Sequence, residues 1–66
     1  MKNSLKVERA IKNITQEDLS KIIGVSRQAI NSIELGKYVP STILALKLSR
    51  YFEKPVNDIF KLEEND

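Results

Sequence analysis

The sequence predicts an all-α fold, with one domain of five short helices over residues 1–66. Apolar residues recur every three or four positions along most of the chain, which is the spacing of a helix with one buried face. Only two glycines and two prolines interrupt this spacing. Because glycine and proline mark helix ends and turns, they divide the chain into segments of helical length without a linker or an internal repeat.

The first two helices are expected over about residues 4–12 and 16–23. Thr15 stands just before the second helix, where its hydroxyl can accept a hydrogen bond from an unpaired main-chain amide. Asp18 lies in the first turn, near the positive end of the helix dipole. Gly24 is suited to end this helix, since glycine readily takes up the left-handed backbone conformation.

Three further helices are predicted by the same kinds of signal. Ser26 and Ser41 are good N-caps for a third and a fourth helix, which are expected to end near Gly36 and Lys54. Pro55 suits the first position of a fifth helix. The apolar residues expected to form the core are Leu19, Ile23, Val25, Ile30, Ile33, Leu44, Ala45, Leu48 and Phe52.

The composition excludes several function classes. The chain has no cysteine and no histidine, so we expect no disulfide and no metal site. No motif for a cofactor or a small-molecule ligand is evident in the sequence, and we expect neither. A core of this size is marginal, and association with a second subunit is the remaining way to raise its stability. The chain shows neither a signal-like apolar run nor a membrane-length segment, which predicts a cytoplasmic protein that does not engage a membrane.

The charges are unevenly distributed along the chain. Residues 1–54 hold ten lysines and arginines against five aspartates and glutamates, whereas residues 55–66 hold one against four. A small body with this excess of positive charge is suited to a polyanion such as nucleic acid.

The two helices on either side of Gly24 indicate a helix-turn-helix over about residues 16–35. A short turn with a glycine, followed by an N-cap, lets the second helix of the pair leave at a steep angle and enter the major groove of DNA. Its outward side chains can donate to or accept from base edges. The residues expected to contact bases are Arg27, Gln28, Asn31 and Ser32.

The run from Thr15 to Glu34, followed by Gly36-Lys37 and Pro40-Ser41, resembles the phage-repressor/Cro-like family of helix-turn-helix transcriptional regulators, also called the XRE family. The resemblance extends over residues 5–60 and implies a five-helix, lambda-repressor-like DNA-binding domain. It identifies residues 25–34 as the recognition helix and double-stranded DNA as the partner.

The resemblance also implies roles for residues outside the recognition helix. Arg9 and Glu34 are expected to form a structural ion pair between the first helix and the end of the third. The residues expected to contact phosphates are Gln16, Ser26, Lys37, Tyr38 and Ser41. For Gln16 this agrees with its place at a helix N-terminus, where free amides attract an anion.

The last third of the sequence, including Ile43 and Leu46, holds more apolar residues than one small core can obviously bury. We therefore expect a homodimer through residues 55–62, with its seam at Val56, Ile59, Phe60 and Leu62. Such a dimer would place two recognition helices roughly 34 to 36 Å apart to read a pseudo-palindrome. A chain without a visible recruiting region is expected to act as a repressor by occupying its operator, while an activating or dual role stays open.

Other interpretations of the same residues remain open. The fold can serve as a protein-interaction module, such as the antitoxin partner of a toxin pair, and salt-dependent DNA binding separates the two functions. An enzyme is disfavoured because the chain lacks histidine, cysteine and a glycine-rich phosphate loop. Asn31 and Ser32 can also be ordinary solvated side chains, and Tyr38 can cover the edge of the core.

Overall fold

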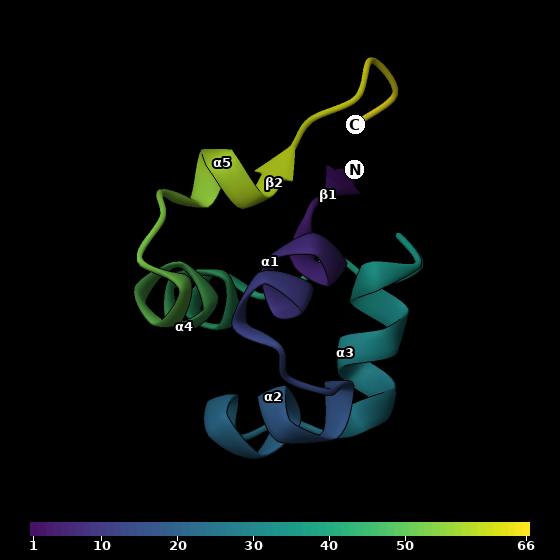
Figure 1. Ribbon diagram of the computed structural model, residues 1–66. Helices are drawn as coiled ribbons and strands as arrows, with labels where there is room; N and C mark the ends of the chain where they lie inside the picture. Colours follow the sequence, from purple (N-terminus) through teal and green to yellow (C-terminus); the bar gives the residue numbers. More distant parts are fainter.

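The computed structural model describes residues 1–66 and contains five α-helices and one small two-stranded sheet (Figure 1). The all-α fold class is therefore confirmed, with only a short sheet added to it. The elements are β1 (Lys2–Asn3), α1 (Leu5–Lys12), α2 (Gln16–Ile23), α3 (Arg27–Glu34), α4 (Thr42–Phe52), α5 (Val56–Ile59) and β2 (Phe60–Lys61).

Three of the helices begin at the caps that the sequence predicts. Thr15 and Asp18 form a capping box, in which the Thr15 hydroxyl accepts from the Asp18 amide and the Asp18 carboxylate accepts from the Thr15 amide, both at 3.0 Å. The hydroxyls of Ser26 and Ser41 accept from the amides three residues further on. Local side-chain chemistry thus fixes where α2, α3 and α4 start.

The end of the chain differs from the prediction. The fifth helix is a single turn, and the backbone becomes extended at Phe60, which pairs with Asn3 in the antiparallel sheet. The sheet continues into α1 through the Ser4 amide, which donates to the carbonyl oxygen of Ile59 at 2.9 Å. The two termini therefore lie side by side (Figure 1). Pairing over such a sequence distance leaves no signal in local periodicity.

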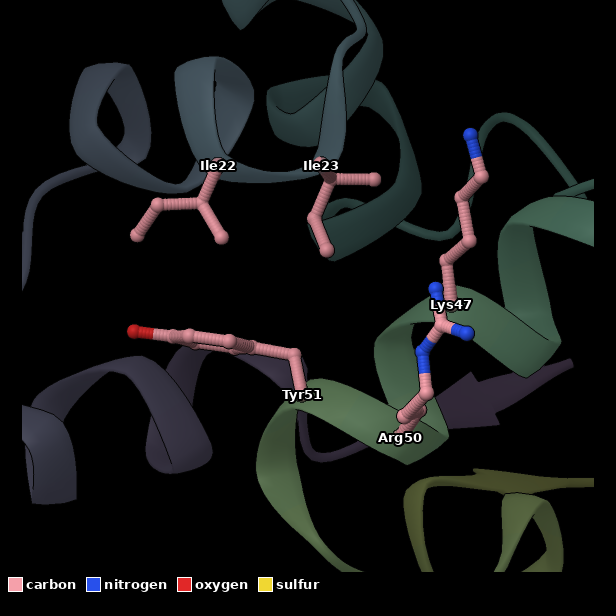
Figure 2. Close-up of a pocket in the computed structure, with 5 residues that line it drawn as sticks. All are labelled: Ile22, Ile23, Lys47, Arg50 and Tyr51. Carbon is pink, nitrogen blue, oxygen red and sulfur yellow. The ribbon is translucent and has the colours of Figure 1, made fainter.

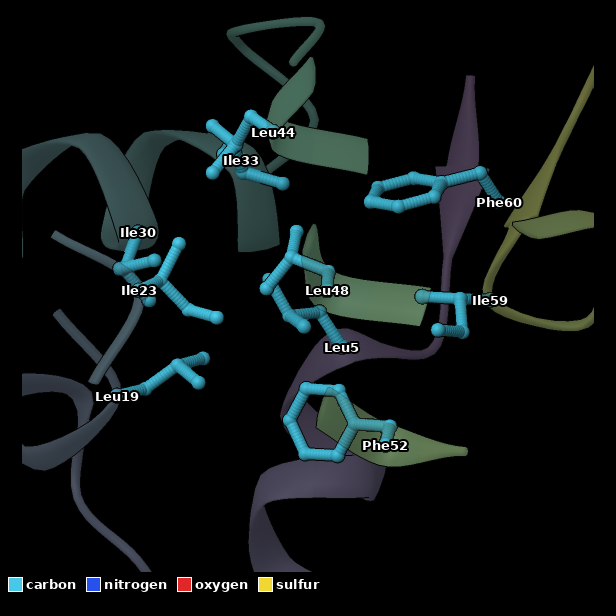
Figure 3. Packing of buried hydrophobic residues seen from close by; sticks show 10 residues of the cluster. All are labelled: Leu5, Leu19, Ile23, Ile30, Ile33, Leu44, Leu48, Phe52, Ile59 and Phe60. Carbon is cyan, nitrogen blue, oxygen red and sulfur yellow. The ribbon is translucent and has the colours of Figure 1, made fainter. Parts of the chain in front are cut away.

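The core lies between the five helices and contains ten buried apolar residues (Figure 3). Val25 and Ala45, which were expected inside it, are only partly buried against it. The buried residues are Leu5, Leu19, Ile23, Ile30, Ile33, Leu44, Leu48, Phe52, Ile59 and Phe60.

Two residues of the expected dimer seam belong to this core. Ile59 is 1% exposed and Phe60 is 6% exposed, so the expectation that they offer apolar surface to a second subunit is wrong. Ile59 ends α5 and Phe60 starts β2, and both side chains point toward the core (Figure 3). Val56 is partly buried, and Leu62 is 81% exposed.

An ion pair joins α1 to the loop between α4 and α5. The Glu8 carboxylate is buried, and the Lys54 ammonium group donates to its Oε2 at 2.8 Å. The pair supplies the counter-charge that a buried carboxylate requires.

The longest helix, α4, has eleven residues. No helix of the protein combines the length and the apolar character needed to cross a membrane.

Replacing Ile59 by alanine should destabilise the single subunit. Removing a fully buried isoleucine side chain leaves a cavity and costs about 3 kcal/mol in the free energy of unfolding. In a domain of this size that loss lowers Tm by more than about 10 °C. Thermal unfolding followed by circular dichroism measures it.

Leu62→Ala is the matched control, because the exposed Leu62 side chain should change the free energy of unfolding by less than about 0.5 kcal/mol. If Ile59→Ala left Tm unchanged and only weakened self-association, Ile59 would belong to the subunit interface after all.

Candidate nucleic-acid interface

The turn between α2 and α3 sets the angle between these two helices. Gly24 ends α2 with φ of 90°, and the amides of Gly24 and Val25 both donate to the carbonyl oxygen of Ser20. A Cβ at position 24 would meet nothing within 4 Å, so the glycine is needed for its backbone conformation and not for space. Directly after this sharp turn Ser26 caps the start of α3.

One face of α3 is buried and the other carries polar side chains to the surface. Ile30 and Ile33 point into the core. On the opposite face Arg27, Gln28 and Asn31 are exposed, and Ser32 is half-buried. These four residues occupy positions i, i+1, i+4 and i+5, which lie side by side on a helix. The structure thus gathers the residues expected to contact bases into one stripe.

Two surface hollows lie on either side of this stripe. The Tyr38 hollow is lined by Ser26, Gln28, Ala29, Ser32, Lys37 and Tyr38. The Gln16 hollow is lined by Arg9, Ala10, Asn13, Ile14, Thr15, Gln16, Glu17 and Arg27. The major groove of DNA is bounded by two phosphate backbones, so a helix seated in it needs contact surfaces on both flanks.

The Tyr38 hollow brings together three of the expected phosphate contacts, namely Ser26, Lys37 and Tyr38. Lys37 and Tyr38 are exposed. The Ser26 hydroxyl accepts from the Ala29 amide at 3.1 Å, which leaves its own hydrogen free to donate. Ser41 lies outside both hollows, at the start of α4.

The Gln16 side chain, which was expected to contact a phosphate, makes hydrogen bonds to two residues of α3. Its amide nitrogen donates to Oδ1 of Asn31 at 3.1 Å and to Oε1 of Glu34 at 3.0 Å. Both hydrogens of that nitrogen are therefore directed at α3. An anion at the start of α2 can therefore be bound only by main-chain amides, because the first turn of a helix has unpaired N–H groups.

Arg9 and Glu34 form a bidentate ion pair between α1 and α3. Nε of Arg9 donates to Oε2 of Glu34 at 2.7 Å, and Nη2 donates to Oε1 at 3.1 Å. A third nitrogen, Nη1, donates to the carbonyl oxygen of Ile14 in the loop before α2. The side chains are 14% and 5% exposed, respectively. A single guanidinium group thus joins α1, the α1–α2 loop and the end of α3.

The ion pair keeps both groups charged. Burial raises the pKa of the Glu34 carboxyl, but the hydrogen bonds from Arg9 and Gln16 and the nearby positive charge outweigh burial and bring the pKa below its ordinary value. The hydrogen bond to Glu34 raises the pKa of Arg9. Because Arg9 neutralises Glu34, this carboxylate adds no net negative charge beside the polar stripe.

The remaining charges around the stripe are mostly positive. Arg27 and Lys37 have no carboxylate partner in any ion pair of the chain. The Asp18 carboxylate is held by the amide and hydroxyl of Thr15, which lower its pKa. Glu17 is the one exposed acid in the Gln16 hollow. This part of the surface is suited to a negatively charged ligand.

Asn3 supports the site in a way that the sequence pattern did not indicate. Its amide nitrogen donates to the carbonyl oxygen of Ile33 at 2.8 Å, and its Oδ1 accepts from the Leu5 amide at 3.1 Å. Asn3 therefore caps α1 in place of Ser4 and also holds the last turn of α3. An asparagine before a helix is a capping signal, but its bond to α3 depends on the tertiary structure.

A further cleft lies on another side of the molecule, between α2 and α4 (Figure 2). Ile22 and Ile23 face Tyr51 across it, and Lys47 and Arg50 stand at one end (Figure 2). These side chains include no acid, thiol or imidazole that could serve as a general base. The chain also contains no group of three or more residues that could hold a metal ion.

Comparison with known proteins gives consistent matches over the whole chain. The model of a family described as helix-turn-helix matches residues 5–59. A protein of Methanocaldococcus jannaschii is 53% identical over 66 residues, which cover 100% of both chains. A protein of Bacillus subtilis is 46% identical with the same coverage, and one of Archaeoglobus fulgidus is 44% identical over 100% of this chain and 93% of its own. All three are named as uncharacterized HTH-type transcriptional regulators.

Removing the positive partner of the ion pair should be strongly destabilising. In Arg9→Met the Glu34 carboxylate stays almost out of water without its counter-ion, which costs about 3 kcal/mol in the free energy of unfolding. Urea unfolding followed by circular dichroism measures the loss.

The control is the double variant Arg9→Met/Glu34→Leu, in which no charge is left unpaired and most of the lost stability should return. A single variant as stable as the original protein would show that the ion pair does not hold the helices together.

Proposed function

This chain belongs to the XRE family of helix-turn-helix transcriptional regulators, and from that premise we propose that it binds a pseudo-palindromic DNA operator as a homodimer and represses transcription. The observation that best supports this proposal is the polar stripe on α3 between two hollows, with Arg27 in the stripe and Lys37 beside it both outside any ion pair. Those are the features needed to read bases and hold phosphates at once.

Base readout is assigned to the polar stripe of α3. The Arg27 guanidinium can donate two parallel hydrogen bonds to O6 and N7 of guanine, and the Gln28 amide can pair with N6 and N7 of adenine. Each such pair discriminates between bases by about 1 to 3 kcal/mol. Ser32, which is half-buried, offers one hydroxyl toward the same groove.

Phosphate contact is assigned to the loop after α3 and to helix starts. Lys37 supplies a full positive charge at the Tyr38 hollow, with the hydroxyls of Tyr38 and Ser26 beside it. Ser41 adds the N-terminus of α4, and Gln16 adds the main-chain amides at the start of α2. These groups would position the protein on DNA without carrying sequence preference.

The dimer seam is assigned to the apolar surface next to this loop. Val39, Ile43 and Leu46 are more than half exposed, on the α3–α4 loop and the first turns of α4. They adjoin an apolar groove that Val56 also lines. A second copy of the chain is the occupant that buries this surface and raises the stability of a small core. Ile59 and Phe60 support the seam from the core beneath it.

Repression follows from the site that the protein occupies. A dimer with two helices in the major groove excludes other proteins from the same base pairs. The alternative, a protein-interaction module such as an antitoxin, would leave the stripe on α3 without a nucleic-acid ligand. Binding to a DNA operator with a steep salt dependence separates the two, because only contacts to phosphates release counter-ions.

Two substitutions should separate base readout from phosphate contact. On an operator selected from random DNA, Arg27→Ala should cost about 1 to 3 kcal/mol in binding and relax preference at one base position. Lys37→Ala should weaken all sequences by a similar factor and reduce the slope of log affinity against log salt by about one unit. Fluorescence anisotropy over a salt series measures both. If both variants weaken all sequences alike, Arg27 is not a base reader.

The proposed seam can be tested in the same protein. Leu46→Glu should convert the dimer into a monomer, because it buries an unpaired charge in an apolar interface. Sedimentation equilibrium at tens of micromolar measures the change. Ile22→Glu, an exposed apolar residue on the α2–α4 side, should leave the association unchanged. A monomeric original protein at this concentration would contradict the dimer.

A further inference from the structure

A continuous line of hydrogen bonds runs from α1 to the outer face of α3. Arg9 donates to both carboxylate oxygens of Glu34, at 2.7 and 3.1 Å. Oε1 of Glu34 also accepts from the amide nitrogen of Gln16 at 3.0 Å, and the same nitrogen donates to Oδ1 of Asn31 at 3.1 Å. The line begins almost out of water at Glu34 and ends at Asn31, which is exposed.

The chemistry of the first two groups fixes the direction of every bond in this line. A guanidinium group can only donate and a carboxylate can only accept, so the Gln16 atom that faces Glu34 must be its nitrogen. That nitrogen again can only donate, so the Asn31 atom that faces Gln16 must be its oxygen. A side-chain amide can usually turn over to suit its partner, but here two charged groups decide which way Asn31 points.

We propose that Arg9 and Glu34, acting through Gln16, hold Asn31 as a hydrogen-bond donor toward the major groove, so that the base atom it meets must be an acceptor. The inference rests on the proposed function and adds a rule for one position of the operator. In this arrangement Gln16 is a positioning residue for specificity. Arg9, which lies in another helix, sets a base preference without reaching DNA.

The proposal specifies which base atoms Asn31 can contact. With its oxygen turned to Gln16, Asn31 has its NH₂ group left for the groove, which suits N7 of a purine, O6 of guanine or O4 of thymine. The exocyclic amino groups of adenine and cytosine are donors and would face another donor. An asparagine without the Gln16 bond could turn over and accept from those amino groups instead.

The test uses operators with single altered base edges. An operator is first selected from random DNA, and Asn31→Ala identifies the base pair at which preference is lost. Two sets of analogues then change this pair. One removes an acceptor atom that Asn31 can meet, such as N7 in a 7-deazapurine, and the other removes the exocyclic amino group. We expect loss of the acceptor to weaken the original protein about tenfold and loss of the amino group to have little effect.

Two variants separate the proposed role from a simple contact. Asn31→Asp keeps an oxygen toward Gln16 but replaces the donor by an acceptor, so its sensitivity should move to the operators that lack the amino group. Gln16→Met keeps the size of the side chain and releases Asn31, so the tenfold effect should shrink while the other base preferences stay. Lys37→Met, the control, should weaken all of these operators by the same factor.

Several outcomes would overturn the inference while leaving the proposed function intact. They are a Gln16→Met protein that binds all operators more weakly by one common factor, an original protein that depends on the amino group, and an Asn31→Ala protein that keeps every base preference. Because Asn31 is exposed, its variants should fold whether or not Gln16→Met does. If no operator is selected at all, the proposed function itself fails, and the inference fails with it.

Discussion

The orientation of α3 depends above all on the ion pair between Arg9 and Glu34. α3 has only eight residues, and isolated helices of that length are unstable in water. Its apolar face contributes two fully buried side chains, which fix its depth in the core more firmly than its direction. The guanidinium group of Arg9 adds direction, because it joins Glu34 to the Ile14 carbonyl oxygen, just before the helix that pairs with α3.

The residues that support α3 and a residue proposed to contact DNA therefore belong to one hydrogen-bond network. Oε1 of Glu34 accepts from both Arg9 and Gln16, and the same Gln16 nitrogen donates to Asn31 on the exposed face. The side chains that stabilise the helix pair also orient a group directed at the proposed ligand. Such a network tolerates change at its exposed end, Asn31, better than at its buried end, because a change at Arg9 or Glu34 leaves a buried charged group unpaired.

Local chemistry made much of the fold predictable. The capping residues Thr15, Ser26 and Ser41 and the left-handed Gly24 act within a few residues of themselves, so α2, α3 and α4 could be placed from the sequence. The stripe on α3 followed from helical spacing alone. What the sequence could not reveal depends on partners far away in the chain. An apolar Phe60 can cover its own core or a second subunit, and an amide at Gln16 can face solvent or α3, and only the tertiary structure decides.

Because β1 pairs with β2, the contacts that secure α3 can be completed only after most of the chain has been synthesised. Asn3 holds the last turn of α3 through the Ile33 carbonyl oxygen, and its own strand is held by Phe60 and Lys61, near the other end of the chain. When α4 has been synthesised, every residue proposed to touch DNA is present in the chain, but β2, which secures β1 and Asn3, is not. Closing so long a loop is slow compared with helix formation. The last turn of α3 is therefore fully secured only after Phe60 and Lys61 have joined the sheet.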